Sequence, residues 1–235
     1  MLSNNLYALV ITLFAALAWL RLNDFAAHRG WINTRISRKI IHMGTGPIFV
    51  LCWPLFTNSP TSRYLAALVP FLITIQFILV GIGLLRDEAA VQAMSRTGNP
   101  REILRGPLFY GIVFIAVTIL YWYDSPIGIV ALMLMCGGDG LADVIGRRYG
   151  KIKLPWNPDK SWAGTLGMLV GGWVFTTGIL IAYGALSIFP NPWISYLPAV
   201  TAISIAGSLV ESLPLHDIDN LTVTVTAVIL GSFLF

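Results

Sequence analysis

Eight runs of apolar residues alternate with short polar segments along the chain. Most of these runs have the length of about 20 residues that an α-helix needs to cross a bilayer. The pattern therefore predicts an all-α polytopic membrane protein with about eight (seven to eight) transmembrane helices. The runs cover residues 5–22, 40–56, 64–85, 108–123, 127–138, 165–189, 195–213 and 221–235.

The fifth apolar run is too short to span a bilayer by itself. It is followed directly by Asp139 and Asp143, and then by Arg147. We expect its helix to continue through both aspartates toward Arg147, which carries two acids to the membrane boundary. Acids near lipid are costly and call for a partner, such as a divalent metal or a cationic side chain.

Composition agrees with a membrane protein and argues against a separate soluble domain. Hydrophobic residues make up 56% of the 235 residues and charged residues 11%, and the mean hydropathy is +0.76. Soluble domains carry about 25% charged residues. We therefore expect one integral-membrane domain over residues 1–235. Cys52 and Cys136 lie in apolar runs without Cys-x-x-Cys or Cys/His spacing, which argues against a disulfide framework or a zinc site.

The distribution of positive charge predicts the topology. If the eight spans alternate, 14 of the 15 Lys and Arg residues fall on one side and only Arg63 on the other. The positive-inside rule then makes the basic side cytoplasmic and places both termini on the opposite face. Membrane headgroups and topology also explain the net charge of +4 better than nucleic acid does.

The densest polar block, residues 137–164, contains the two aspartates. Asp139 and Asp143 are one helical turn apart, so they can share a Mg²⁺ ion or divide metal binding and base catalysis between them. Gly137, Gly138 and Gly140 leave room for backbone to approach a phosphate. The alternative is a helix end with solvated acids.

The end of this block offers cations for a phosphate. Lys160 and Ser161 lie in NPDKSWAG, a Pro-marked turn that leads into the sixth apolar run, near a helix N-terminus that favours phosphate oxygens. For Arg147, Lys151 and Lys153, two interpretations stay open: nucleotide phosphate binding, or topology anchoring with headgroup contacts. In the sixth run we expect glycines to permit close helix packing, at Gly164, Gly167, Gly171 and Gly172.

Two basic patches precede the second and fourth runs. His42 follows Lys39 by three residues, so both lie on a similar helix face. His42 suits either a phosphate contact and alcohol deprotonation or a structural hydrogen bond. Arg105 is a candidate phosphate clamp, and a surface charge cluster of Arg101 and Glu102 is the alternative.

A third cluster lies between the seventh and eighth runs, around a Pro-broken helix end. Its members are Glu211, Asp217, Asp219 and Asn220. Hard oxygen ligands suit Mg²⁺ or the sugar hydroxyls of a nucleotide. In the alternating topology this cluster shares the cytoplasmic face with the basic loops, so a nucleotide would be bound on that side.

The assembled motifs resemble the phytol kinase and farnesol kinase group of the wider polyprenol and dolichol kinase family. The similarity covers nearly the whole chain, in the segments SRKIIHMGTG, WPLFTNS, ILRGPL, SPIG, CGGDGLADVIGRRYGKIKLPWNPDKSWAG and ESLPLHDIDNLTV. It implies transfer of the γ-phosphoryl group, typically from CTP, to the hydroxyl of an isoprenoid alcohol such as phytol, in phytol salvage for tocopherol synthesis. The enzyme would lie in a membrane of bacterial or cyanobacterial type.

With this resemblance, the candidate residues take roles. Asp139 and Asp143 would bind Mg²⁺, one of them or His42 would assist deprotonation, and Glu211, Asp217 and Asp219 would complete the metal or nucleotide shell. Lys160 and the Arg side chains would neutralise phosphate charge. The prenol would enter from the lipid phase and the nucleotide from the cytoplasm.

One departure refines the assignment within the family. Dolichol kinases and phosphatidate cytidylyltransferases usually carry Glu in a KxxEG segment, where this chain has KSWAG with Ala163. The difference favours the phytol and farnesol branch over a cytidylyltransferase. A small transporter is a further alternative, although transporters hold their substrates near the bilayer midplane and often contain repeats. Chain-length preference, the choice among CTP, UTP and ATP, and the oligomeric state are left open.

Overall fold

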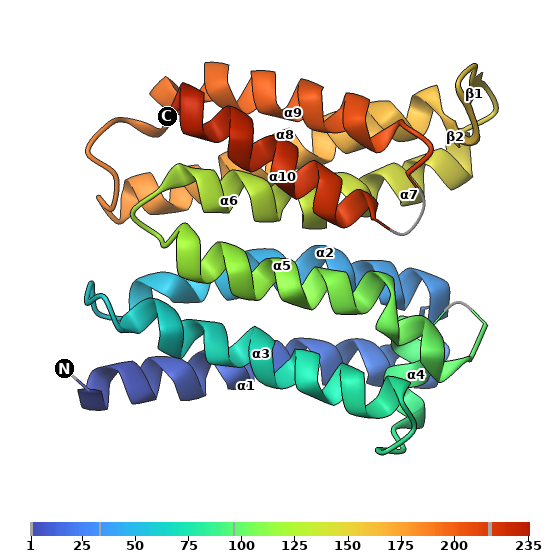
Figure 1. Cartoon of the computed structure of the whole chain (residues 1–235), viewed down its shortest axis with the longest axis horizontal. Coiled ribbons are helices and arrows are strands. Elements are labelled where there is room, and N and C mark those ends of the chain that lie inside the picture. The colour runs from blue at the N-terminus through green and yellow to red at the C-terminus, as the bar shows by residue number, and fades with distance from the viewer. Residues whose placement is uncertain (1, 33, 96, 216–217) are drawn as a thin grey trace. The chain divides into compact units, whose positions relative to one another are not determined.

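The computed structural model describes residues 2–32, 34–95, 97–215 and 218–235, and they are almost entirely helical. The chain forms two compact units, Met1–Ile119 and Leu120–Phe235 (Figure 1). Within the described residues, six helical stretches are long and apolar enough to cross a membrane. The prediction of an all-α polytopic membrane protein is confirmed. The six stretches are Asn4–Ala27, Ser62–Gly81, Pro100–Leu120, Pro126–Tyr149, Trp162–Ala185 and Trp193–Glu211.

Each of the eight predicted runs corresponds to a helical segment. The two beyond the six apolar stretches are α2 (Thr34–Cys52), whose first half carries Arg38, Lys39 and His42, and α10 (Asp219–Leu234), which has only 16 residues. A full crossing takes about 20 residues in a straight helix. That α2 and α10 also span the membrane therefore stays a prediction.

The first unit consists of four long helices with short elements between them. The long helices are α1 (Leu2–His28), α2, α3 (Ser62–Gly81) and α5 (Gly106–Leu120), and the short ones are η1 (Trp53–Leu55), α4 (Glu88–Met94) and η2 (Pro100–Leu104). Buried Asn5 on α1 donates to the Ser62 hydroxyl at 3.0 Å. Phe49 on α2 packs against Phe114 on α5.

The core of the second unit is one continuous helical rod of three parts. They are α6 (Pro126–Met133), the π-helical turn η3 (Leu134–Gly138) and α7 (Asp139–Tyr149). Every residue from Ile129 to Cys136 is buried. The predicted continuation of the fifth run through both aspartates is therefore confirmed. Around the rod lie α8 (Trp162–Ala185), α9 (Leu197–Glu211) and α10 (Figure 1), and the short η4 (Trp193–Tyr196) contacts α8 and α9.

A small β-hairpin joins α7 to α8. Strand β1 (Lys153–Leu154) pairs antiparallel with β2 (Asn157–Ser161), with an irregular register between the two paired positions. The expected Pro-marked turn at Asn157–Lys160 is thus wrong, because these residues form a strand. A two-stranded sheet has only edge strands, and an edge strand with an irregular register tolerates Pro158.

Glycines bring α7 and α8 into close contact. A Cβ atom added to Gly167 would lie 2.9 Å from the carbonyl oxygen of Leu141, and one on Gly164 would lie 3.2 Å from that of Ala142. A Cβ on Gly171 would collide with the carbonyl of Gly137. The predicted packing role of these glycines is confirmed, and their small size sets the distance between the helix that carries Asp139 and the helix that follows Lys160.

Gly171→Ala is expected to lower stability by about 2 kcal/mol, because the new methyl group meets backbone that cannot rotate away. For a chain of this size, that loss corresponds to a Tm lower by roughly 4–8 °C, measured by thermal unfolding in detergent. Gly178→Ala is the matched control, since a Cβ there meets nothing within 4 Å. Equal Tm values for the two variants would contradict the packing role.

Candidate active site

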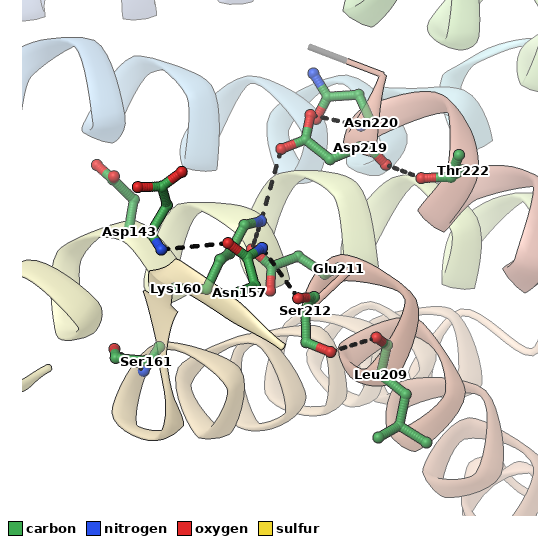
Figure 2. A network of polar contacts seen from close by, with 12 residues as sticks. Asp143, Asn157, Lys160, Ser161, Leu209, Glu211, Ser212, Asp219, Asn220 and Thr222 are labelled. Carbon is green, nitrogen blue, oxygen red and sulfur yellow. Dashed lines mark hydrogen bonds and ion pairs between the residues drawn. The ribbon is translucent and has the colours of Figure 1, made fainter. Parts of the chain in front are cut away.

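The centre of the candidate site is an ion pair between the hairpin and the end of α9. Lys160 Nζ on β2 donates to Glu211 Oε1, and its Nζ also lies 3.9 Å from Asp219 Oδ2 on α10. Figure 2 shows Lys160 between these two carboxylates. Residues from three elements of the second unit therefore meet at one ammonium group.

Glu211 occupies an unfavourable position for a carboxylate. It is the last residue of α9, at the negative end of the helix dipole, and the residue is only 4% exposed. Its second oxygen, Oε2, has no hydrogen-bond partner among the described residues. A buried carboxylate with one oxygen unpaired requires a nearby cation, and Lys160 supplies one.

Asp219 is held at the first turn of α10, where the helix dipole favours negative charge. Its Oδ1 accepts from the backbone N–H of Asn220 at 3.0 Å, and its carbonyl accepts from the Thr222 hydroxyl at 3.1 Å. The predicted acidic cluster near the C-terminus thus contributes Glu211, Asp219 and the backbone of Asn220. Asp217, its fourth predicted member, lies outside the described residues.

Asp139 reaches the same site from the central rod. It is half-buried at the start of α7, and its carboxylate acts electrostatically on Glu211, as that of Asp219 does. The π-helical turn ends directly before it, with the N–H of Asp139 bonded to the carbonyl of Leu134 five residues back. Such turns interrupt α-helices mostly as single turns, and frequently at functional sites.

The glycines around Asp139 have a packing reason. Gly138 is buried, and an added Cβ would meet the Met168 sulfur at 2.6 Å, while Gly140 is also buried. The close approach that Gly138 permits is therefore made to α8. A direct phosphate contact by Gly138 or Gly140 stays a prediction.

Asp143 makes a different set of contacts from Asp139. Its Oδ1 accepts from Arg147 Nε at 2.8 Å, in an i,i+4 pair whose Arg side chain is 60% exposed. Both predicted residues thus neutralise each other at the surface of α7. Pairs of this kind on an exposed helix face contribute little to stability.

Ser161 and the hairpin lysines differ in their surroundings. The buried Ser161 hydroxyl caps α8 by accepting from the N–H of Gly164 at 3.2 Å. Lys151 and Lys153 are exposed. The structure therefore gives Ser161 a local structural role, while the hairpin lysines remain open to solvent or headgroups.

The remaining candidates belong to the first unit. His42 stacks at a tilt on Tyr110, with ring centroids 4.6 Å apart, and its backbone carbonyl accepts from the Tyr110 hydroxyl at 2.9 Å. Lys39, on the same helix, is half-buried, and Arg105 is exposed at the start of α5. His42 thus has a structural contact, and a catalytic role for any of the three stays a prediction.

The carboxylate oxygens of the described site residues are the kind of ligand that Mg²⁺ prefers, but they are not grouped closely around one point. Asp139, Glu211 and Asp219 offer hard carboxylate oxygens, and the unpartnered Oε2 of Glu211 is available to a cation. Among the described residues, however, no three His, Cys, Asp or Glu side chains are grouped closely enough to hold a metal. The Lys160 ammonium lies beside two of the three carboxylates, so a metal would have to share these oxygens with it.

Sequence reasoning found the charged members of the site but missed the residues that connect them. Asn157 and Trp156 on the hairpin both bond to Ser212, at 3.1 and 3.2 Å. The π-helical turn and the direct Lys160–Glu211 pair were also missed. The available signals were weak: a polar Asn within a basic turn, and a Ser next to an acid that ends an apolar run.

Comparisons with known proteins identify relatives over nearly the full chain. The chain is 40% identical over 233 residues to a protein of Glycine max named "Probable phytol kinase 1, chloroplastic", covering 98% of this chain and 77% of that protein. It is 36% identical to "Phytol kinase 1, chloroplastic" of Arabidopsis thaliana, covering 99% of this chain and 77% of that protein. It is 39% identical over 209 residues to "Farnesol kinase, chloroplastic" of Arabidopsis thaliana, covering 88% of this chain and 68% of that protein.

No model of a known protein family matches the chain, and no solved structure does. The relatives' names refer to the chloroplast, so they do not support the expected bacterial or cyanobacterial type of membrane. The resemblance to prenol kinases seen in the sequence is confirmed. With this identity over nearly its whole length, the chain belongs to the family of phytol and farnesol kinases.

Proposed function

We propose that the protein is a CTP-dependent phytol kinase, which transfers the γ-phosphoryl group of CTP to the hydroxyl of phytol and serves phytol salvage for tocopherol synthesis. Family membership supports the reaction class. The observation that carries the site assignment is the Lys160–Glu211 pair, buried at the end of an apolar helix and flanked by Asp139 and Asp219. Such a concentration of charge at a membrane boundary is expensive unless it serves chemistry.

In the proposed reaction, the phytol oxygen forms a bond to the γ-phosphorus while the bond from that phosphorus to the β,γ-bridging oxygen breaks, so that CDP leaves. The hydroxyl proton passes to a carboxylate, Asp139 or Asp143, with His42 as the alternative acceptor. Lys160 neutralises charge on the transferred group. A loose phosphoryl transfer of this type depends mainly on positioning and charge neutralisation.

Mg²⁺ would be held by Asp139, Glu211 and Asp219, with Asp143 and Asp217 as further candidates, and when bound it would neutralise negative charge on the phosphates. Lys160 would then shift from its carboxylate partners toward a phosphate oxygen. The positive charge of Lys160 would then neutralise the carboxylates before the substrate binds and the nucleotide phosphates afterwards.

The site is proposed to face the cytoplasmic side, with both termini on the other side. The loops that carry 14 of the 15 basic residues support this orientation. A water-soluble nucleotide would approach from that side, and a long prenol would enter laterally from the lipid with its hydroxyl at the membrane surface. One integral-membrane kinase domain over residues 1–235 remains part of the proposal.

Farnesol or geranylgeraniol is the second candidate substrate, favoured by the 39% identity to a farnesol kinase. The deciding experiment incubates purified protein with γ-labelled CTP, UTP or ATP and a panel of prenols, and identifies the labelled lipid. Labelled phytyl monophosphate formed best with CTP is the expected result. Preferential labelling of a shorter prenol would move the assignment to the second candidate. Absence of a labelled prenol with γ-labelled CTP, together with a labelled cytidine-linked lipid when the CTP is labelled at the α-phosphate instead, would reject both in favour of a cytidylyltransferase.

A further inference from the structure

The amide of Asn157 bonds to backbone on both sides of the Lys160–Glu211 pair. Its Nδ2 donates to the carbonyl of Ser212 at 3.1 Å, and its Oδ1 accepts from the N–H of Asp159 at 3.2 Å. Ser212 directly follows Glu211, and Asp159 directly precedes Lys160. One side chain thus connects the residues adjacent to both members of the ion pair (Figure 2).

Asn157 is built into the fold as a fixed element. It is only 3% exposed, and it stands opposite Leu154, a position where the two short strands pair. A buried amide that lost these bonds would leave polar groups unsatisfied. The orientation of the amide is therefore determined by its surroundings, which makes it a rigid connection between β2 and the end of α9.

A second, weaker connection runs beside it. The Trp156 indole donates to the Ser212 hydroxyl at 3.2 Å, and that hydroxyl donates to the carbonyl of Leu209 at 2.6 Å. Trp156 is 45% exposed and packs edge-on against Trp162, with ring centroids 5.5 Å apart. This bond ties the hairpin to the same residue, but through a side chain that solvent and lipid can reach.

We propose that Asn157 is the positioning residue of the site, which holds the hairpin against the end of α9 so that Lys160 stays within reach of Glu211 and Asp219. Lysine has a flexible stem with many rotamers, so the position of its ammonium group depends on the backbone that carries it. Sites that act by positioning lose much of their rate when a supporting contact shifts by about 1 Å. The kinetic part of this inference rests on the proposed function, whereas its structural part does not.

The structural test measures how fast the Lys160 amine reacts with an acylating reagent. The folded protein is labelled briefly in detergent and then digested, and the labelled peptides are quantified by mass spectrometry. Lys153 lies on the same hairpin and Lys151 two residues before it, and both are exposed, so they serve as internal references. Asn157→Ala is expected to raise labelling of Lys160 about five-fold relative to both. An unchanged ratio would overturn the proposal, whether or not the protein phosphorylates phytol.

The kinetic test separates turnover from substrate binding. Asn157→Ala is expected to lower kcat for prenol phosphorylation by about 30-fold with less than a three-fold change in the KM for the prenol. The amide bonds to the hairpin and to the residue that follows α9, so its loss should displace Lys160 without removing a contact to the prenol. Asn157→Asp keeps the oxygen that faces Asp159 but loses the donor to Ser212, so it should lower kcat to a similar extent. An Asn157→Asp protein with wild-type kcat and labelling would reject the proposal even if Asn157→Ala fails to fold.

Matched tryptophan variants provide the control. Trp156→Phe removes the indole bond to Ser212 while keeping an aromatic ring at the position that packs against Trp162, and it should lower kcat no more than about three-fold. Trp173→Phe removes an equivalent indole bond, at 3.0 Å to the Thr201 hydroxyl of α9, away from the hairpin, and should leave both kcat and Lys160 labelling unchanged. Equal effects of Trp173→Phe and Asn157→Ala would show a general loss of stability instead of a positioning role.

Discussion

Lys160→Met is expected to lower phosphoryl transfer at least 100-fold and to destabilise the protein. The substitution keeps most of the side-chain volume but leaves the Glu211 carboxylate buried without its ammonium partner. Breaking a buried pair in this way costs about 3 kcal/mol, at the low end of the usual range because the Lys160 side chain is 26% exposed. Prenol phosphorylation and thermal unfolding in the same detergent measure the two effects.

The control for this prediction is the double variant Lys160→Met, Glu211→Gln. It removes the uncompensated charge, so it should recover stability to within about 1 kcal/mol of wild type, because neutral replacement of a buried pair is often tolerated. Activity should stay low, since no ammonium remains for the phosphate. If activity returned together with stability, Lys160 would be a structural residue without a role in the reaction.

Asp139→Asn is expected to lower kcat about 100-fold with little loss of stability. Removing the Asp139 charge relieves its repulsion of Glu211, so Tm should stay constant or rise slightly. The reaction would lose a proposed base and metal ligand, and such groups contribute about 10²–10⁴-fold to rate. Steady-state kinetics and Tm measured on one preparation separate the two effects.

Asp124→Asn is a suitable control for the charge change. Asp124 is an exposed carboxylate of the same unit that precedes the first residue of α6, whereas Asp139 begins α7. Its substitution should change kcat less than two-fold. An Asp139→Asn protein as active as the Asp124→Asn protein would remove Asp139 from the site, and the acid-base role would then have to pass to Asp143 or His42.

The elements that could be predicted from the sequence are those in which local pattern and packing agree. The apolar run before Asp139 is too short to span, which correctly required the helix to continue through Asp139 and Asp143 toward Arg147; it ends at Tyr149. Pro214, three residues after Glu211, marked the end of α9. The spacing of Gly164, Gly167 and Gly171 indicated close helix packing, because small residues at such intervals bring two helix backbones together.

The connections within the site depend on contacts between distant parts of the chain. Lys160 and Glu211 are 51 residues apart, and no local pattern shows that they form a direct pair. Strand β1 contains only two residues, too few for a recognisable alternation of side chains, and Pro158 in β2 argued for a turn. Asn157 was overlooked for the same reason, since its function comes from what surrounds it.

The direction of Asp139 depends on the π-helical turn that precedes it in the rod. One residue more than an α-helix requires is accommodated between Leu134 and Gly138. Each residue turns an α-helix by about 100°, so the same number of residues wound as an ordinary α-helix would rotate α7, and Asp139 with it, by about 100° relative to α6. The π-helical turn thus keeps Asp139 directed toward the carboxylates at the ends of α9 and α10 although the rod contains one residue more.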